Sequence, residues 1–171
     1  CVMADFSPIY ESMLANEGGY RLTNDKTDAG GMTYAGIARN FHPKWQGWQL
    51  IDAGQDIPAQ MVREFYRKVF WSPVGGEMIN EPAIARTLFD FAVNAGVDVA
   101  IKLAQVVVGT TPDGRAGPKT ITAINEVEPR LFMALYSLAK LARYRDSVKK
   151  RPANIKYLVG WINRLLREAS A

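Results

Sequence analysis

From residue 56 onward, apolar side chains recur every three or four positions in a series of segments, which is the spacing of one buried helix face. Proline or aspartate opens most of these segments, and both residue types favour the start of a helix. The spacing therefore predicts a run of helices, at 57–72, 82–95, 99–108, 118–126, from 129 onward, and at 154–168.

Two of these predicted helices carry further expectations. The helix at 82–95 is apolar nearly all round, so we expect it at the centre of the core. Its polar exceptions, Asp90 and Asn94, lie one turn apart, and we expect them to brace a neighbouring loop because buried polar groups need partners. Asn94 is also a candidate substrate-binding residue. In the helix from 129, the residues expected to face inward are Leu131, Leu135, Leu138 and Leu141.

Residues 18–55 lack a long helical period and are rich in glycine, aspartate, asparagine and aromatic residues. Short strands of a hairpin are predicted at 20–22 and 32–34, the start of a short helix at 36–39, and a loop at 42–48. A compact domain rarely keeps so long an irregular segment unless that segment has a function. The predicted fold class is therefore mainly α, with a small irregular or short β-hairpin lobe near the N-terminus.

Composition limits the classes of protein that this chain can be. Its 171 residues, 48% of them hydrophobic, suit one ordinary globular domain, with or without a small appendage. Apolar runs stay well short of the roughly 20 residues of a membrane span, so we expect no membrane insertion. The single cysteine, Cys1, and the single histidine, His42, argue against a zinc site and a thiol nucleophile. We expect a monomer without metal or cofactor.

The C-terminal quarter of the chain is basic. Residues 129–171 hold ten Lys and Arg against two Asp and Glu, whereas residues 1–128 hold 11 against 15. Such a balance attracts an anionic polymer, with cell wall, nucleic acid and lipid surface as the alternatives. A solvated helix face is the commoner explanation of such charge. We expect no nucleic-acid binding, because no recognition-helix or aromatic-basic strand motif accompanies the charge.

Glu17 ends the first predicted helix, which begins at Ser7 and Pro8. It lies in the last turn, on the face that carries Tyr10 and Met13. The partial negative charge of a helix C-terminus and a partly apolar wall both disfavour a carboxylate, so we expect a raised pKa for Glu17. A raised pKa suits a general acid. The alternative is a solvated glutamate at a frayed helix end.

The loop after Glu17 carries two aspartates, Asp25 and Asp28, and either one can supply an ionised second carboxylate. The adjacent Gly30 and Gly31 allow the backbone to approach a sugar, or simply form a tight turn. Thr33 can hold an attacking water, because its hydroxyl both donates and accepts.

Aromatic residues near this loop are candidates for stacking on sugar rings. Trp45 and Trp48 are favoured because they fall in a predicted loop. Core packing is instead expected for Trp71 and Trp161. The remaining candidates are Tyr20 and Tyr34.

Two motifs resemble one family closely. Glu-Gly-Gly-Tyr at 17–20 and Asn-Asp-x-x-Asp-x-Gly-Gly-x-Thr-x-x-Gly-Ile at 24–37 resemble the opening of glycoside hydrolase family 108, the bacterial and phage N-acetylmuramidases. The resemblance continues through residues 65–71 and 88–96.

Residues from 97 onward are similar to the predicted peptidoglycan-binding module that is usually fused to that family. Asp-Gly-Arg-Ala-Gly-Pro at 113–118 and Gly-Trp-Ile-Asn-Arg at 160–164 carry this second similarity. We therefore expect a catalytic part at 1–96 and a peptidoglycan-binding part at 97–171, packed as one compact unit.

The resemblance implies a lysozyme-like fold and cleavage of the β-1,4 bond between N-acetylmuramic acid and N-acetylglucosamine in peptidoglycan. It implies Glu17 as the catalytic acid, Asp25 or Asp28 as the aspartate, and Thr33 as the threonine; we favour Asp25. A water held by Thr33 favours an inverting reaction. A chitin-type hydrolase and a non-catalytic wall-binding or secretion-assisting protein on the same fold stay open.

The resemblance also bears on where the protein acts. Its expected partner is the glycan strand of peptidoglycan, so we expect action in the periplasm or cell wall. A secretory signal is not visible. We therefore expect release by lysis or delivery by another system.

Overall fold

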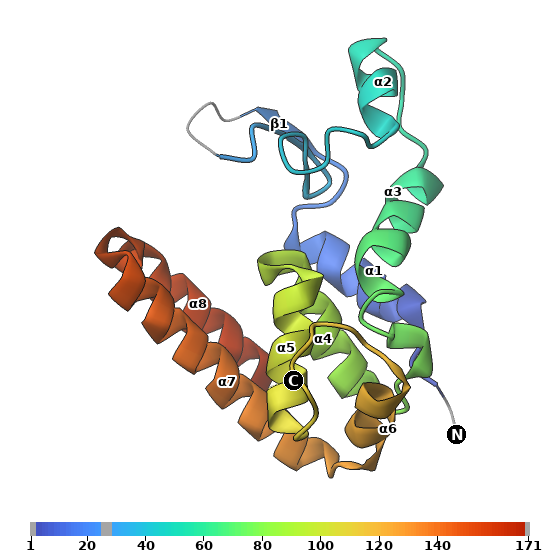
Figure 1. Cartoon of the computed structure of the whole chain (residues 1–171). Coiled ribbons are helices and arrows are strands. Elements are labelled where there is room, and N and C mark those ends of the chain that lie inside the picture. The colour runs from blue at the N-terminus through green and yellow to red at the C-terminus, as the bar shows by residue number, and fades with distance from the viewer. Residues whose placement is uncertain (1–2, 25–28, 170–171) are drawn as a thin grey trace. The chain divides into compact units, whose positions relative to one another are not determined.

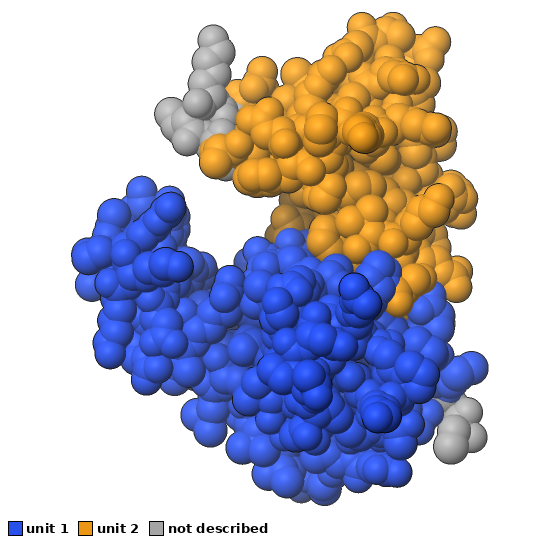
Figure 2. Space-filling view, in the orientation of Figure 1, with its two compact units in different colours: residues 1–4, 73–171 blue, residues 5–72 orange. Residues whose placement is uncertain are grey.

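The computed structural model describes residues 3–24 and 29–169, which are mainly helical with one small sheet (Figure 1). The chain divides into two compact units: residues 5–72 form unit 2, and residues 1–4 with 73–171 form unit 1 (Figure 2). The predicted mainly α class with a short β-hairpin lobe near the N-terminus is confirmed. Among the described helices, none combines the length and apolar character needed to cross a membrane.

Unit 2 contains helices and one small antiparallel sheet with its strands in the order β1-β2-β3. Thr23 of β1 pairs with Thr33 of β2, and Tyr34 of β2 pairs with Ile37 of β3. The predicted hairpin is therefore present, with its second strand at 32–34 as expected and its first strand at 22–24 instead of 20–22. Its elements are α1 (Phe6–Asn16), β1 (Leu22–Asn24), β2 (Met32–Tyr34), β3 (Ile37–Ala38), α2 (Gly47–Asp52), α3 (Ala59–Tyr66) and the π-helical turn η1 (Arg67–Trp71).

Three local expectations for unit 2 are corrected. Asp5 rather than Ser7 caps α1, since its carboxylate accepts the Ser7 N–H at 3.0 Å. Segment 36–39 forms a turn and strand β3 instead of a helix, because Ala35 and Gly36 both have left-handed φ, 50° and 80°, which suits a tight hairpin turn. Helix α2 begins inside the segment predicted as loop.

Unit 1 is a group of helices around the apolar helix α4. Leu88 and Phe89 of α4 and Ile101 of α5 are fully buried, which agrees with a central position for α4. The predicted start residues Pro82, Pro118 and Pro129 are confirmed as the first residues of three helices. The elements are the 3₁₀ turn η2 (Gly76–Met78), α4 (Pro82–Ala95), α5 (Val97–Val107), α6 (Pro118–Glu126), α7 (Pro129–Lys150), the 3₁₀ turn η3 (Pro152–Asn154) and α8 (Ile155–Ala169).

The inward face of α7 differs from the prediction. The leucine row is exposed, with Leu131 at 50% and Leu138 at 61%. The buried row is instead aromatic and spaced by four residues, apart from one lysine. It consists of Phe132, Tyr136, Lys140 and Tyr144.

Lys140 explains how the buried row of α7 is stabilised. Its Nζ donates to Thr87 Oγ1 of α4 at 2.8 Å and forms an ion pair with Glu168 of α8. It also lies over the rings of Phe91 and Tyr136, at 5.3 and 5.0 Å from their centroids. These contacts tie α7 to α4 and α8, so the aromatic face is the one that packs.

The expected boundary between a catalytic part at 1–96 and a peptidoglycan-binding part at 97–171 stays a prediction. The contacts group α4, which precedes this boundary, with α5 and α7, which follow it. The division between compact units falls after Ser72.

Candidate functional site

Glu17 follows the last turn of α1, and two glycines determine how the chain leaves it. Gly18 and Gly19 have left-handed φ of 87° and 72°. The Gly18 N–H donates to Ala15 O at 3.1 Å, and the Gly19 N–H donates to Leu14 O at 2.9 Å. This pair of bonds is a Schellman motif, which ends the helix sharply. The Glu-Gly-Gly motif thus holds an exposed carboxyl at a helix C-terminus.

The turn between β2 and β3 lies against the Glu17 side chain. A Cβ added to Gly36 would lie 3.1 Å from Glu17 Cγ and 2.5 Å from the Tyr66 hydroxyl. Gly36 also has the left-handed φ of 80° that glycine adopts without strain. The glycine of the Thr-x-x-Gly-Ile motif is therefore required both by the turn and by the approach of Glu17.

Tyr66 of α3 connects this turn to the core of unit 2. Its buried hydroxyl donates to Ala35 O at 2.8 Å, and Ala35 has a left-handed φ of 50°. Burial raises the pKa of Tyr66 well above its ordinary value, and the negative charge of Glu17 raises it further. Tyr66 therefore remains a protonated donor at neutral pH, close enough to Glu17 to feel its charge.

The predicted carboxylates Asp25 and Asp28 lie outside the described residues and stay predictions. Within the described residues, no group of three His, Cys, Asp or Glu side chains is arranged to hold a metal ion. The second carboxylate of the site therefore rests on the sequence alone.

Asn40 braces the glycine loop that precedes β2. Its side-chain amide donates to Ala29 O at 3.0 Å, and its backbone N–H donates to Gly30 O at 3.2 Å. A Cβ on Gly31, where φ is 66°, would lie 2.9 Å from Asn40 Nδ2. This crowding favours the tight-turn explanation for Gly31. Thr33 follows in β2, and its hydroxyl donates to Gly31 O at 3.2 Å.

Two of the predicted sugar-stacking residues come together. The rings of Tyr34 and Trp45 are nearly parallel, with centroids 6.2 Å apart, and both side chains are partly exposed. The exposed Tyr20 adds to the positive shift in the pKa of Tyr34, whose main cause is burial. Tyr34 and Trp45 therefore form a partly open aromatic surface of unit 2, and Tyr20 lies near enough to Tyr34 to affect its pKa.

Trp48 does not have the open position expected of it. It lies in α2, is only 2% exposed, and its indole N–H donates to His42 O at 2.8 Å. The guanidinium of Arg39 lies over its ring at 5.4 Å and pairs with Asp52, with oxygen-nitrogen distances of 2.7 and 2.6 Å. Trp48 is therefore a core residue that anchors α2.

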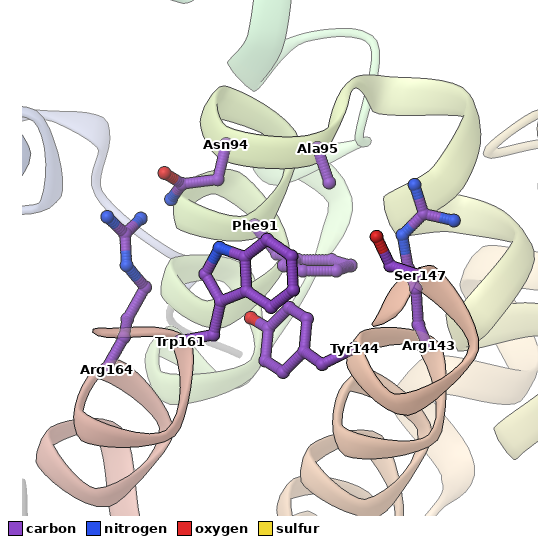
Figure 3. A pocket seen from close by; sticks show the side chains of 8 residues that line it. All are labelled: Phe91, Asn94, Ala95, Arg143, Tyr144, Ser147, Trp161 and Arg164. Carbon is purple, nitrogen blue, oxygen red and sulfur yellow. The ribbon is translucent and has the colours of Figure 1, made fainter. Parts of the chain in front are cut away.

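Asn94 lies in unit 1, at the end of α4. Its amide donates to Asp90 O at 2.7 Å, one turn earlier in the same helix, and so does not brace a loop as predicted. It lines a cavity of about 200 Å³ together with residues of α7 and α8, among them Trp161 and Arg164 (Figure 3). This cavity lies wholly within unit 1, whereas Glu17 belongs to unit 2.

The Asp113 to Pro118 motif forms a turn around a buried glutamine. Gln105, which is 1% exposed, donates to Asp113 Oδ1 at 2.7 Å and to Thr120 Oγ1 at 3.1 Å, and it accepts the Gly114 N–H at 2.9 Å. Gln105 thus provides hydrogen-bond partners for the turn from the buried side. The motif therefore has a structural role in this turn.

Three residues at the site were not identified as functional from the sequence: Gly36, Asn40 and Tyr66. The first was part of a recognised motif without an assigned role. The helical spacing of apolar residues indicated only that Tyr66 belongs to a buried helix face. The available signal was Gly36 itself, since a hairpin turn favours glycine at its second central position.

Comparisons with known proteins agree with this arrangement. The family model described as Glycosyl hydrolase 108 matches residues 10–96, just over half of the chain, and the model described as Predicted Peptidoglycan domain matches residues 99–166. The solved structure of SagA from Brucella abortus is 26% identical, with a TM-score of 0.79, over 96% of this chain and 91% of that one. A comparison with curated proteins found no match.

The similarity to SagA confirms the predicted lysozyme-like, mainly α fold. The two family matches cover the same motifs that the sequence resemblance rested on. The chain therefore belongs to glycosyl hydrolase family 108 and, with its peptidoglycan domain, is a peptidoglycan hydrolase.

Proposed function

We propose that this hydrolase is an N-acetylmuramidase, a lysozyme that cleaves the β-1,4 bond between N-acetylmuramic acid and N-acetylglucosamine, with Glu17 as the general acid. The observation that carries the proposal is the close approach of Gly36 and the Tyr66 hydroxyl to the Glu17 side chain. A carboxyl that is only a solvated helix end needs no such fitted surroundings. A general acid does, because proton transfer depends on a fixed position.

The reaction needs an acid, a base and a water. Glu17 gives its proton to the glycosidic oxygen as the bond to the anomeric carbon breaks. A loop carboxylate, Asp25 in preference to Asp28, takes a proton from a water whose oxygen bonds to that carbon. Thr33 uses its proton on Gly31 O, so its oxygen lone pairs can accept the second hydrogen of the water. The products are a new reducing end and a free hydroxyl, with inverted configuration.

The partly exposed pair of Tyr34 and Trp45 is the proposed sugar platform of the same unit. Aromatic faces offer a large, rigid apolar surface against which a sugar ring can pack. Tyr20, which is 47% exposed, extends this surface with a hydroxyl that can reach polar groups of the glycan. The backbone of Gly30 and Gly31 offers a further close approach.

Mass spectrometry of digested peptidoglycan tests the proposal. Wild-type protein should release fragments with reducing N-acetylmuramic acid. Glu17→Gln should lose about 10²- to 10⁴-fold in rate, the usual contribution of a general acid, while keeping the fold. Glu11→Gln is the matched control, because Glu11 is an exposed glutamate of the same helix. It should digest the polymer at the wild-type rate.

Other results would point elsewhere. Near-normal activity in folded Glu17→Gln would remove Glu17 from the acid role. Fragments ending in reducing N-acetylglucosamine would show a different glycosidase. Wall binding without new reducing ends would show a non-catalytic binding protein, and cleavage of chitin oligomers alone would show a chitin-type enzyme. A first-formed β anomer, detected by proton NMR, would show retention and remove the water-holding role of Thr33.

A further inference from the structure

The cavity of unit 1 lies where α4 ends beside the helix pair α7 and α8 (Figure 3). Trp161 lines it, and Figure 3 shows the indole between the side chains of Arg143 and Arg164. Trp161 and Arg164 belong to the Gly-Trp-Ile-Asn-Arg motif at 160–164, to which the hydrolytic reaction assigns no role. The cavity is thus built from residues of three helices, and part of a recognised motif lies inside it.

In the described part of the chain, neither arginine of this cavity is held in an ion pair, although Arg164 lies close enough to Asp90 of α4 to lower the pKa of that carboxyl. The only acidic residues of α7 and α8 are Asp146 and Glu168, and these pair with Arg145 and Lys140. Neither Arg143 nor Arg164 forms an ion pair or hydrogen bond within residues 3–24 and 29–169. The N–H groups of both guanidinium groups are therefore open to an anion from outside.

The rest of the cavity is aromatic and small. Trp161 is stacked on Tyr144, with ring centroids 5.0 Å apart and an interplanar angle of 24°. Burial and the negative charge of Glu168 raise the pKa of Tyr144, and the positive charges of Arg164 and Arg143 oppose that rise, so both arginines act on the same hydroxyl. A volume of about 200 Å³ corresponds to roughly six or seven water molecules. The cavity has room for about one residue-sized group.

We infer that this cavity binds a free carboxylate carried by the peptides of peptidoglycan, an assignment that rests on the proposed wall-hydrolysing function. Guanidinium groups bind planar carboxylates through paired, charge-assisted hydrogen bonds. In intact peptidoglycan the lactyl carboxyl of muramic acid is consumed in an amide bond, so the free carboxylates belong to the peptides. The aromatic floor accepts the small apolar side chain beside such a carboxylate. The cavity of unit 1 thereby binds the peptide, while unit 2 acts on the glycan.

Binding of a defined probe tests this inference with the full chain. N-acetyl-D-alanyl-D-alanine is titrated as the free acid and as its C-terminal amide, and the Trp161 indole N–H signal is followed by NMR. The chain has four tryptophans, so Trp161→Phe identifies this signal. We expect the acid to shift the signal with millimolar affinity and the amide to bind at least tenfold more weakly. Arg143→Gln and Arg164→Gln should each weaken binding of the acid about tenfold.

Arg145→Gln is the matched control, because it removes the same charge from α7 at a residue already paired with Asp146. It should bind the acid like wild type. Equal binding of acid and amide, or equal weakening by Arg145→Gln and Arg143→Gln, would overturn the inference. Methyl glucuronide carries the same carboxylate on a sugar. If it binds as tightly as the peptide, the assigned peptide is wrong.

The two proposals can fail separately. The peptide probe contains no glycosidic bond, so its binding does not depend on Glu17 or on hydrolysis. Loss of glycan cleavage with intact peptide binding would remove only the muramidase proposal. Normal release of reducing ends, with no shift of the Trp161 signal by the peptide, would remove only the cavity assignment.

Discussion

The side chain of Glu17 occupies the space beside Gly36 into which the Cβ of any other residue at position 36 would project. A Cβ on Gly36 would lie 3.1 Å from Glu17 Cγ and 3.2 Å from Glu17 Cβ. The two residues belong to the end of a helix and to a hairpin turn, so the turn acts as a wall for the proposed acid. The position of Glu17 thus depends on a residue that bears no functional group.

Gly36→Ala should therefore reduce activity through Glu17. The added methyl group would lie 2.5 Å from the Tyr66 hydroxyl and 3.1 Å from Glu17 Cγ, so it must displace the hydroxyl and also push against Glu17. Misplacement of a catalytic group by about 1 Å costs up to about 100-fold in rate, so we expect a loss of about 10- to 100-fold per folded molecule. Peptidoglycan digestion, normalised to the folded fraction from circular dichroism, measures this loss. The loss should fall on kcat more than on KM.

Gly54→Ala is the control for Gly36→Ala. Gly54 has a similar left-handed φ of 67°, but no atom lies within 4 Å of an added Cβ. This variant should lose about 1 kcal/mol in the free energy of unfolding, because alanine is strained at a left-handed φ, and it should keep the wild-type rate. Equal rates for the two variants would mean that Gly36 does not position Glu17.

Tyr66→Phe should destabilise the turn that contains Ala35 and Gly36, because it removes the hydrogen bond from the Tyr66 hydroxyl to Ala35 O. The substitution leaves the Ala35 carbonyl, in a residue that is 1% exposed, without its donor. An unsatisfied buried polar group costs about 1–3 kcal/mol, and we expect that loss in the free energy of unfolding. Tyr10→Phe is the comparison, because within the described part of the chain the Tyr10 hydroxyl has only a long contact of 3.4 Å with Tyr20. Equal losses in urea unfolding of the two variants would contradict the role of Tyr66.

The sequence predicted helices well where local signals were sufficient. Pro82, Pro118 and Pro129 are each the first residue of a helix, and side chains of Glu81 and Glu128 cap two of these helices. Such signals act within one turn and need no knowledge of the fold. The hairpin was likewise predictable from short apolar segments around a glycine-rich loop.

The packing of α7 could not be predicted in this way. Helical spacing allows both a leucine row and an aromatic row to face inward, and spacing does not choose between them. The choice depends on Lys140, which is buried because Glu168, 28 residues later, provides its counter-charge. The same limit applies to Glu17, whose neighbour Gly36 comes from another element. Contacts between distant residues decided both outcomes.

Lys140→Met should destabilise the protein far more than an exposed lysine substitution. The side chain of Lys140 is fully buried and that of Glu168 is 16% exposed, so loss of the lysine leaves a largely buried carboxylate without its partner. Breaking such a pair costs about 3–5 kcal/mol, measured by urea unfolding. Adding Glu168→Gln should recover part of the loss. Lys102→Met breaks an exposed pair with Asp98 and should cost less than about 1 kcal/mol. Equal losses for Lys140→Met and Lys102→Met would refute the importance of burial.

Asp90 of α4 should make the protein less stable as pH rises toward neutrality. Burial raises the pKa of Asp90 to about 6, with a further rise from Glu168, although Arg86, Lys140 and Arg164 oppose it. An unfolded aspartate has a pKa of about 3.9, so between about pH 4 and 6 the folded state holds a proton that the unfolded state has released. The free energy of unfolding therefore falls through this interval and stays lower above it.

Asp90→Asn should remove this dependence, because the amide has a similar shape and no charge. We expect the variant to be more stable than wild type by about 1–3 kcal/mol at pH 7.5, with the difference vanishing near pH 4. Urea unfolding of both proteins at several pH values between 4 and 7.5 measures the difference directly. Asp146→Asn is the control, since Arg145 lowers the pKa of the exposed Asp146 and gives a dependence of opposite sign. A constant difference between Asp90→Asn and wild type across this range would show that Asp90 does not titrate there.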